Sequence, residues 1–226
     1  MYKHVSLLVG KQDAGSNTDQ WTERFVSAVD DFDSVQRSHH VLPIDREATE
    51  YDGLAELYFD SSDAVAGAGD HPVLEDTPVG DSIALDRSPW MAGEEVVELD
   101  HTDGDTDGCY KHSAFLIRKE GMSYDAFLDH WSTEHVPLAR KIPGVVRYSR
   151  VVPIDRSAVE FDGIAELYFD DLSALRAGLG HESSRDYDPD HPRAKAPRDD
   201  VDNFLEIGDR PRFVGEERVI LSSTTQ

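Results

Sequence analysis

Two residues in the second half of this sequence could carry out chemistry together. His135 lies in the segment WSTEHVPLARKIPGVVRY, and Tyr148 follows it thirteen residues later, beyond a Pro-Gly pair. A histidine can accept or release a proton near neutral pH, and a tyrosine hydroxyl can orient a substrate oxygen or donate to a developing enolate. The alternative for His135 is a core histidine whose ring nitrogens are satisfied by the protein itself.

The segment that contains His135 has the spacing of one helix face. At intervals of four, four, three and four residues, this face contains Phe127, Trp131, His135, Leu138 and Ile142. Such spacing places the histidine in the middle of an apolar stripe. Pro137 cannot donate a backbone hydrogen bond to Thr133, so we expect a kink just after His135. Pro143-Gly144 predicts the end of the helix, and VVRYSRVV predicts a strand, so both candidate side chains could reach one pocket.

The composition is that of a strongly acidic protein. The chain has 226 residues, with 46 Asp and Glu against 22 Lys and Arg and a formal net charge of -24. The acidic residues are spread along the chain, so their mutual repulsion is strong in dilute buffer and screened at molar salt. This pattern is typical of a protein from a salt-accumulating halophile. The lack of a basic stripe argues against a nucleic-acid partner.

Targeting and membrane signals also bear on the class of protein. The N-terminal run MYKHVSLLVGKQD predicts a first strand and not a signal peptide. No segment approaches the roughly 20 apolar residues that cross a bilayer. The single cysteine, Cys109, excludes an internal disulfide and a cysteine-based metal cluster. We therefore expect a soluble, cytoplasmic protein without a membrane partner, which could form homo-oligomers.

The chain contains an internal duplication. VLPIDREATEYDGLAELYFD, which begins at Val41, returns as VVPIDRSAVEFDGIAELYFD from Val151, with fifteen of twenty positions identical. The YKH of the N-terminus and a later GEE also return, on the two sides of this repeat. The sequence thus predicts two units, residues 1–100 and 109–226, joined by a Gly- and Asp-rich segment.

Each unit is predicted to be a ferredoxin-like βαββαβ arrangement, which gives an α+β fold. In the second unit the elements fall near residues 111–118, 123–142, 145–153, 163–169, 173–178 and 216–222. The first unit has a shorter first helix, TDQWTERFVSAVDDF, with Phe25 on its inner face. A four-stranded sheet with both helices on one face leaves the other face open. The two sheets can cover one another within one chain, so we predict an intramolecular barrel.

Alternation along the strands predicts which side chains line the space between the sheets. One face of the first strands is uniformly apolar, with Val5, Leu7 and Phe115, and we expect it under the helices. The mixed face contains His112 in the first strand of the second unit, and Glu166 and Tyr168 in its third strand. We expect these three side chains in a cavity between the sheets; the alternative is a packed interface in which Glu166 and His112 bond each other.

The two units differ in ways that favour the second as the functional one. The first unit has no counterpart of His135 or Pro137, and Ser38 stands at the position of Tyr148. The second unit also has a long polar insert, ESSRDYDPDHPRAKAPRDD, which is expected to be a lid or disordered. Its DPDHP stretch offers oxygen and histidine ligands but no second cluster, so no metal site is predicted. Gly-rich phosphate loops, G-x-S-x-G and H-E-x-x-H are absent.

Four segments of the second unit, taken in order, resemble the EthD family of dimeric α/β-barrel proteins, named for an ether-degradation gene cluster. They are RKEGMSYDAFLDHW, HVPLARKIPGVVRY, FDGIAELYFDD and DNFLEIGDRPRFVGEE, and the resemblance covers nearly all of residues 110–221. It implies a barrel of two ferredoxin-like units, which family members with one unit make by dimerising.

The resemblance also implies a site. In lactone-isomerising proteins similar to this family, a His and a Tyr at the positions of His135 and Tyr148 are the functional pair. Trp131 and Tyr168 would then be flat walls for a small ligand, with His112 and Glu166 as further binding residues. Haem-binding relatives of the barrel exist, for which His112 or His135 would be the axial ligand, but the residues themselves predict no cofactor. We expect a cofactor-independent isomerase, cyclase or lyase for a small hydrophobic oxygenated molecule; the alternative is a non-catalytic ligand-binding or stress-related protein.

Overall fold

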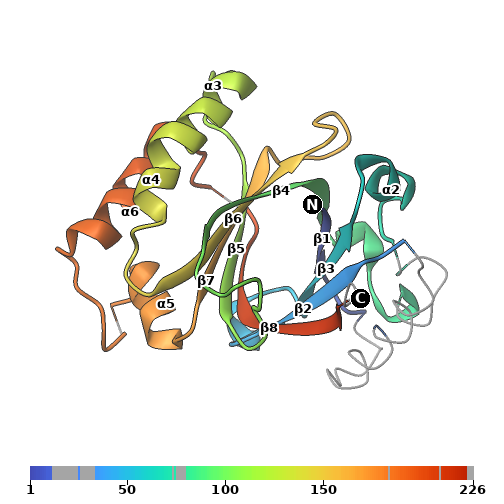
Figure 1. The fold of residues 1–226 in the computed structure, drawn as a ribbon, viewed down its shortest axis with the longest axis horizontal. Helices are drawn as coiled ribbons and strands as arrows, with labels where there is room; N and C mark the ends of the chain where they lie inside the picture. The colour runs from blue at the N-terminus through green and yellow to red at the C-terminus, as the bar shows by residue number, and fades with distance from the viewer. Residues whose placement is uncertain are drawn as a thin grey trace.

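The protein, described here as a computed structural model, is built around an eight-stranded antiparallel barrel that closes on itself (Figure 1). The structure describes residues 1–11, 25, 34–72, 74, 80–182, 184–208 and 210–222. In chain order the strands are β1 Tyr2–Leu8, β2 Arg37–Pro43, β3 Gly53–Phe59, β4 Trp90–Asp100, β5 Tyr110–Leu116, β6 Val145–Pro153, β7 Gly163–Phe169 and β8 Arg212–Ser222. Around the barrel they follow the order β1-β3-β2-β8-β5-β7-β6-β4.

Each unit contributes four neighbouring strands with the ferredoxin-like order. The first sheet is β4-β1-β3-β2 and the second is β8-β5-β7-β6. The two sheets also join at both edges, because β2 pairs with β8 and β4 pairs with β6. The expected α+β barrel of two ferredoxin-like units in one chain is confirmed. Because the barrel closes, none of these eight strands has a free edge. Free edges in open sheets promote aggregation.

The helices lie outside the barrel, against the sheet of their own unit. In the second unit, α3 Tyr124–His130 continues into a π-helical turn, η4 Trp131–His135, and then α4 Val136–Ala139; α5 Leu172–Gly178 and α6 Pro192–Phe204 follow. Figure 1 shows these helices gathered on one side of the barrel and α2 Ser62–Gly67 on the other. Three short 3-10 turns, η1 Arg46–Ala48, η2 Gly80–Ser82 and η3 Leu85–Arg87, belong to the first unit. The predicted helix TDQWTERFVSAVDDF lies outside the described residues, except for Phe25, which is helical and buried.

The assignment of sheet faces in the first strands of the two units was wrong. The uniformly apolar residues Val5, Leu7 and Phe115 pack together inside the barrel and not under the helices. The mixed face of β5, including His112 and Ala114, lies under the helices of the second unit. The physical reason is closure: the interior of a small closed barrel is filled by side chains from both sheets, and the apolar residues of β1 and β5 meet there. The prediction for β7 holds, since Glu166 lies inside the barrel.

The insert after α5 contains an ordered helix. Helix α6, residues 192–204, begins in that segment and packs against η4 and α4. The helix begins with Pro192, a residue favoured in the first turn because its missing N–H has no partner there, and it accommodates Pro197 in its interior. Neither the sequence of the insert nor its length predicted a helix. Among the described residues, no helix is both long enough and apolar enough to cross a membrane.

Candidate functional site

A cavity of about 440 Å³ lies in the second unit, between the outer face of its sheet and the helices that cover it. Strands β5 to β8 form its floor, and η4, α4, α5 and α6 form its walls and cover. Its polar and aromatic lining includes His112, Trp131, His135, Tyr148, Phe204 and Arg210. Most of the remaining lining is aliphatic, so the cavity suits a small molecule with an apolar body and few polar groups.

The backbone around His135 makes a wide turn that its sequence explains. The N–H of Val136 bonds the carbonyl of Trp131, five residues earlier, where an α-helix would reach back four. Pro137 follows immediately and lacks the N–H that would restore the α-helical ladder. The kink expected at this proline therefore takes the form of a π-helical turn, and both Trp131 and His135 line the cavity from it.

A carboxylate from α6 holds the His135 ring. Nδ1 of His135 lies 3.0 Å from Oδ2 of Asp200. Asp200 also contacts Nε2 of His130 at 3.0 Å and accepts from Nδ2 of Asn203 at 2.9 Å. Because a carboxylate only accepts hydrogen bonds, Nδ1 of His135 carries the proton, and Nε2 is left with its lone pair. His130 contacts the same carboxylate but does not line the cavity.

Burial sets the charge states of this group. Desolvation lowers the pKa of His135 below its usual value, while the hydrogen bond to Asp200 opposes that shift. Although burial favours the protonated acid, hydrogen bonds from Asn203, His135 and His130 lower the pKa of Asp200. At neutral pH the pair is therefore a neutral imidazole beside an ionised carboxylate. This combination can accept a proton at Nε2 and stabilise the imidazolium that results.

Tyr148 reaches the same cavity from β6. Its hydroxyl oxygen accepts a hydrogen bond of 2.9 Å from Nε1 of Trp131. Burial raises the pKa of Tyr148, so the phenol is neutral and its own proton can be donated to a ligand. The indole of Trp131 is held in turn: the guanidinium of Arg150 lies 5.1 Å from its ring centre, and a Cβ added at Gly163 would lie 2.5 Å from the indole. Only glycine at 163 leaves room for this ring.

Two of the residues predicted to bind substrate lie elsewhere. In the pairing of β5 with β7, His112 is opposite Leu167 and Ser113 is opposite Glu166. Paired residues share a sheet face, so His112 faces the cavity while Glu166 and Tyr168 face the barrel interior. The expectation of one cavity containing His112, Glu166 and Tyr168 was therefore wrong, as was the alternative of a bond between His112 and Glu166.

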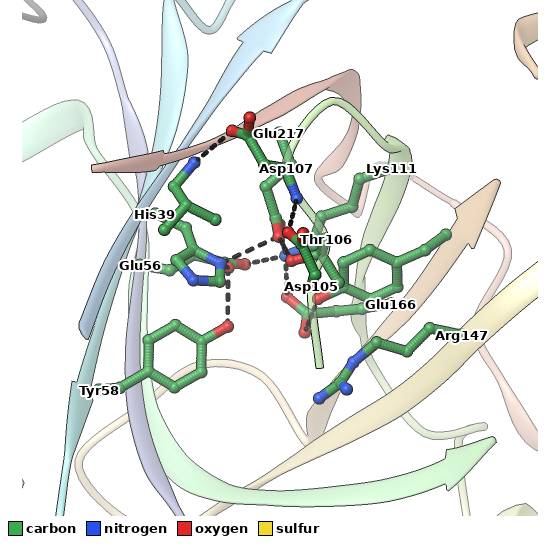
Figure 2. A network of polar contacts seen from close by, with 12 residues as sticks. His39, Glu56, Tyr58, Asp105, Thr106, Asp107, Lys111, Arg147, Glu166 and Glu217 are labelled. Atoms are coloured by element: carbon green, nitrogen blue, oxygen red, sulfur yellow. Dashed lines mark hydrogen bonds and ion pairs between the residues drawn. The ribbon is translucent and has the colours of Figure 1, made fainter. Parts of the chain in front are cut away.

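Glu166 belongs to a buried ion network that crosses the interface of the two sheets (Figure 2). The hydroxyl of Tyr168 donates to Glu166 at 3.4 Å. Lys3 of the first unit bonds Glu166 of the second at 2.6 Å. Conversely, Lys111 of the second unit pairs with Glu56 of the first, and also lies 2.9 Å from Glu217. The network follows the internal duplication, because Lys3 and Lys111, and also Glu56 and Glu166, are equivalent positions. It joins the units, and Lys3, Glu56, Lys111, Glu166 and Glu217 are not among the residues that line the cavity.

One part of this network has metal-ligand character. A nitrogen of His39 and carboxylate oxygens of Glu56 and Glu217 lie within 4.8 Å of one another. However, the ammonium group of Lys111 contacts both carboxylates, and Nδ1 of His39 lies 2.9 Å from Glu217. The positive charge that a metal would supply is already present, so the donor set fits an internal ion network better than a metal site.

Sequence reasoning missed three residues of the cavity region. Asp200 lies in the insert, where no pattern marked it. Arg210 and Arg212 lie in the segment quoted for the family resemblance, and they line the cavity beside His112. The duplication carried a signal for them, because the first unit has Ser88 and Trp90 at the equivalent positions, on either side of a shared proline.

Comparison with known proteins gives matches at the level of family and fold. Residues 119–206 match the profile of the EthD domain. An uncharacterised 11.0 kDa protein of Rhodococcus erythropolis, from the thcB-thcC intergenic region, is 34% identical over 97 residues, which are 42% of this chain and 84% of that protein.

Two solved structures share the barrel over most of their length. An anthrone oxidase-like protein superposes with a TM-score of 0.65 at 16% identity, covering 99% of this chain and 94% of its own. The chlorite dismutase from Candidatus Nitrospira defluvii in complex with imidazole gives a TM-score of 0.60 at 10% identity, covering 97% and 91%. At these identities the similarity is one of fold alone.

Proposed function

Because this chain belongs to the EthD family, we propose that its second unit is a cofactor-independent enzyme that moves a proton on a small, largely apolar, oxygenated molecule. The reaction would be an isomerisation, cyclisation or elimination. One observation carries the proposal: the histidine of a His135–Asp200 pair and the neutral phenol of Tyr148 line the same largely apolar cavity. A base and a hydrogen-bond donor facing one pocket are the minimum for proton abstraction beside a carbonyl group.

The proton transfer is assigned to Nε2 of His135. This nitrogen takes the proton from a carbon next to a carbonyl group, and the electron pair of the broken C–H bond moves onto the carbonyl oxygen. Asp200 holds the ring through Nδ1 and stabilises the imidazolium that forms. Return of the proton to another carbon gives an isomer, whereas expulsion of a leaving group gives an elimination product. Neither route requires an external oxidant or reductant.

The hydroxyl of Tyr148 is assigned to the developing enolate oxygen. It accepts from Trp131, which leaves its proton for the substrate, and its raised pKa keeps it protonated at neutral pH. A fixed donor in a buried site stabilises a developing negative charge without reorganising solvent. The indole of Trp131 and the ring of Phe204 provide flat walls against which a ring-shaped substrate can lie.

The two units have different roles in this proposal. Residues 109–226 carry the site, and residues 1–100 complete the barrel and supply half of its internal ion network. The absence of Tyr148 and His135 equivalents in the first unit supports this division, because the shared frame evidently folds without them. The contact of His135 with a carboxylate, in place of a backbone group, favours an enzyme over a non-catalytic ligand-binding protein.

The test is exchange of carbon-bound hydrogen for deuterium, followed by NMR in D₂O with a panel of small cyclic ketones, lactones and phenols. We expect exchange by the natural chain, and a loss of about a hundredfold or more in His135→Ala. His130→Ala is the matched control, since His130 contacts Asp200 from outside the cavity. Because burial lowers the pKa of His135, the acidic limb of the rate profile is expected below pH 6.5, the ordinary value for histidine.

Two results would contradict this proposal. If the natural chain and His135→Ala exchanged hydrogen at the same rate, His135 would not be the base, and the reaction would not take place at this site. Addition of hemin is the second check. A shifted Soret band that disappears in His135→Ala, and not in His130→Ala, would identify a haem protein in place of a cofactor-independent enzyme.

A further inference from the structure

We propose that the ligand of this cavity carries a carboxylate group, and that Arg210, assisted by Arg212, binds it. The inference rests on the proposed function, because it names the class of substrate on which His135 acts. It places the negative charge of the ligand at the β8 end of the cavity and the reacting carbon at the His135 end.

The first observation is that two nitrogen atoms of Arg210 lack acceptors among the described residues. This partly buried side chain lines the cavity, and within the described residues its Nε and Nη1 atoms have no hydrogen-bond partner. A guanidinium that is withdrawn from water without acceptors is costly. Burial, together with the nearby charge of Arg212, lowers the pKa of Arg210 to about 10, so it is still charged at neutral pH. A bound anion would satisfy both its charge and its free donors.

Other arginines of the protein form ion pairs with carboxylates, and Arg210 differs from them. The chain has 46 acidic residues against 22 basic ones, so a carboxylate is seldom far from an arginine. Four other partly buried arginines do bind carboxylates: Arg118 and Arg156 pair with Asp162, Arg147 with Glu95 and Asp100, and Arg150 with Glu98. In this acidic protein, an arginine that faces a cavity without such a partner in the described part of the chain indicates that the partner comes from outside.

The surroundings of Arg210 are electropositive. Desolvation, with a contribution from the charges of Arg210 and Arg212, lowers the pKa of His112 to about 3. Arg198 also lines the cavity, and its Nη1 donates to the backbone carbonyls of Ala177 and Gly178. The acidic residue in the lining is Asp202, which is exposed. Asp200 is close by, but its oxygens are used by His130, His135 and Asn203. The field at this end of the cavity therefore attracts an anion, against the net charge of the whole chain.

The first unit shows that the fold does not require these arginines. Trp90 holds the place of Arg212, since it is opposite Ser6 in β1 just as Arg212 is opposite Ala114 in β5. Its ring stacks on His4, the equivalent of His112, with centroids 5.1 Å apart and planes 10° from parallel. The same sheet position is thus filled by an aromatic stack in one unit and bordered by two cations in the other.

The chemistry favours a carboxylate over a more highly charged group. A guanidinium matches the planar pair of carboxylate oxygens, with hydrogen bonds strengthened by charge. The rest of the lining is mostly aliphatic, including Leu116, Ile142, Leu167 and Val201. A ligand with an apolar ring and a single negative charge at one end suits a cavity with arginines at one end and aliphatic side chains elsewhere. A phosphate dianion would require more hydrogen-bond donors.

The experiment compares two probes of equal shape, 2-naphthoate and 2-naphthamide, by isothermal titration calorimetry at one fixed salt concentration. We expect the natural chain to bind naphthoate at least tenfold more tightly than naphthamide, although its net charge repels anions. Arg210→Gln should weaken naphthoate binding by about tenfold to a hundredfold and leave naphthamide binding unchanged. Arg185→Gln, at an exposed arginine outside the cavity lining, is the matched control and should change neither affinity.

The following results would contradict the proposal that the ligand carries a carboxylate group. Equal affinities for the two probes, or an Arg210→Gln chain that still prefers naphthoate, would overturn the assignment. If deuterium exchange still depends on His135 in that case, the proposed function stands without it. Failure of both probes to bind the natural chain would contradict both proposals. Displacement of naphthoate by millimolar inorganic phosphate would replace the carboxylate with a phosphate group. Unchanged melting and near-ultraviolet circular dichroism of Arg210→Gln would show that the fold is intact.

Discussion

The two units differ at one equivalent position of their sheets, which is occupied by His4 in the first unit and by His112 in the second. In the first unit His4 stacks against Trp90 and its Nε2 lies 2.9 Å from the carbonyl oxygen of Asp70, so the space beside the histidine is filled. In the second unit His112 borders a cavity of about 440 Å³. Desolvation lowers the pKa of both histidines to about 3, so both rings are neutral at neutral pH, although His4 is buried and His112 is half-buried beside the cavity. The comparison shows that one copy of a duplicated unit can keep this position tightly packed, while the other copy has a cavity lined by charged side chains there.

The barrel interior shows the opposite behaviour, because there the two units have stayed alike. Lys3 and Lys111 each pair with glutamates of both units, and Tyr58 and Tyr168 each donate to the glutamate two residues earlier. A change on one side of this network would leave a charge on the other side unpaired. The lysines, glutamates and tyrosines of the interior are therefore matched between the units, although His39 stands where the second unit has Ser149.

The largest expected effect is a test of this symmetry. Lys111→Met should lower the free energy of unfolding by about 3 to 5 kcal/mol, because Glu56, Glu166 and Glu217 would be left buried together. Lys3→Met, at the equivalent position, should cost a similar amount. Urea unfolding followed by circular dichroism measures both. If one substitution were costly and the other neutral, the two units would not share the network equally.

An intermediate effect separates the surface from the interior. We propose that the acidic surface is an adaptation to a salt-rich cytoplasm, and we expect the free energy of unfolding to rise by on the order of 2 kcal/mol between dilute buffer and 1 M KCl. The cost of Lys111→Met should change little over the same range, because buried pairs are screened less than exposed charges. A midpoint of unfolding that stays constant from dilute to molar salt would remove the halophile interpretation.

The smallest expected effect comes from a substitution that gives the second unit the tryptophan of the first. Arg212→Trp should place an indole beside His112, as Trp90 lies beside His4, and fill part of the cavity. We expect naphthoate binding to weaken at least tenfold, about 1.4 kcal/mol, with the melting temperature unchanged or raised. Calorimetry and a thermal melt of the same sample measure both quantities. Unchanged naphthoate affinity would show that Trp90 and Arg212 are not equivalent in their effect on the cavity.

Much of the chain organisation could be read from the sequence. The repeat that begins at Val41 and Val151 predicted two units with the same strand order, and the apolar spacing from Phe127 to Ile142 predicted the helical segment that contains His135. The Pro-Gly pair before β6 marked the turn correctly, since Gly144 has a φ of 79°, which favours glycine. These features depend on local periodicity and turn chemistry, which neighbouring residues determine by themselves.

The tertiary structure decided the rest. Alternation in a strand separates two sets of side chains, but only closure of the barrel determines which set lies inside, and this is why His112 was wrongly placed in one cavity with Glu166 and Tyr168. Asp200 comes to His135 from a helix sixty-five residues later in the chain, and Arg210 comes from the segment before β8. No local pattern marks such residues, because their role arises from packing between elements that are distant in the sequence. The sequence by itself determined the strands and the helical segment that contains His135, whereas the closure of the sheets and the packing of α6 determined which residues meet in the cavity.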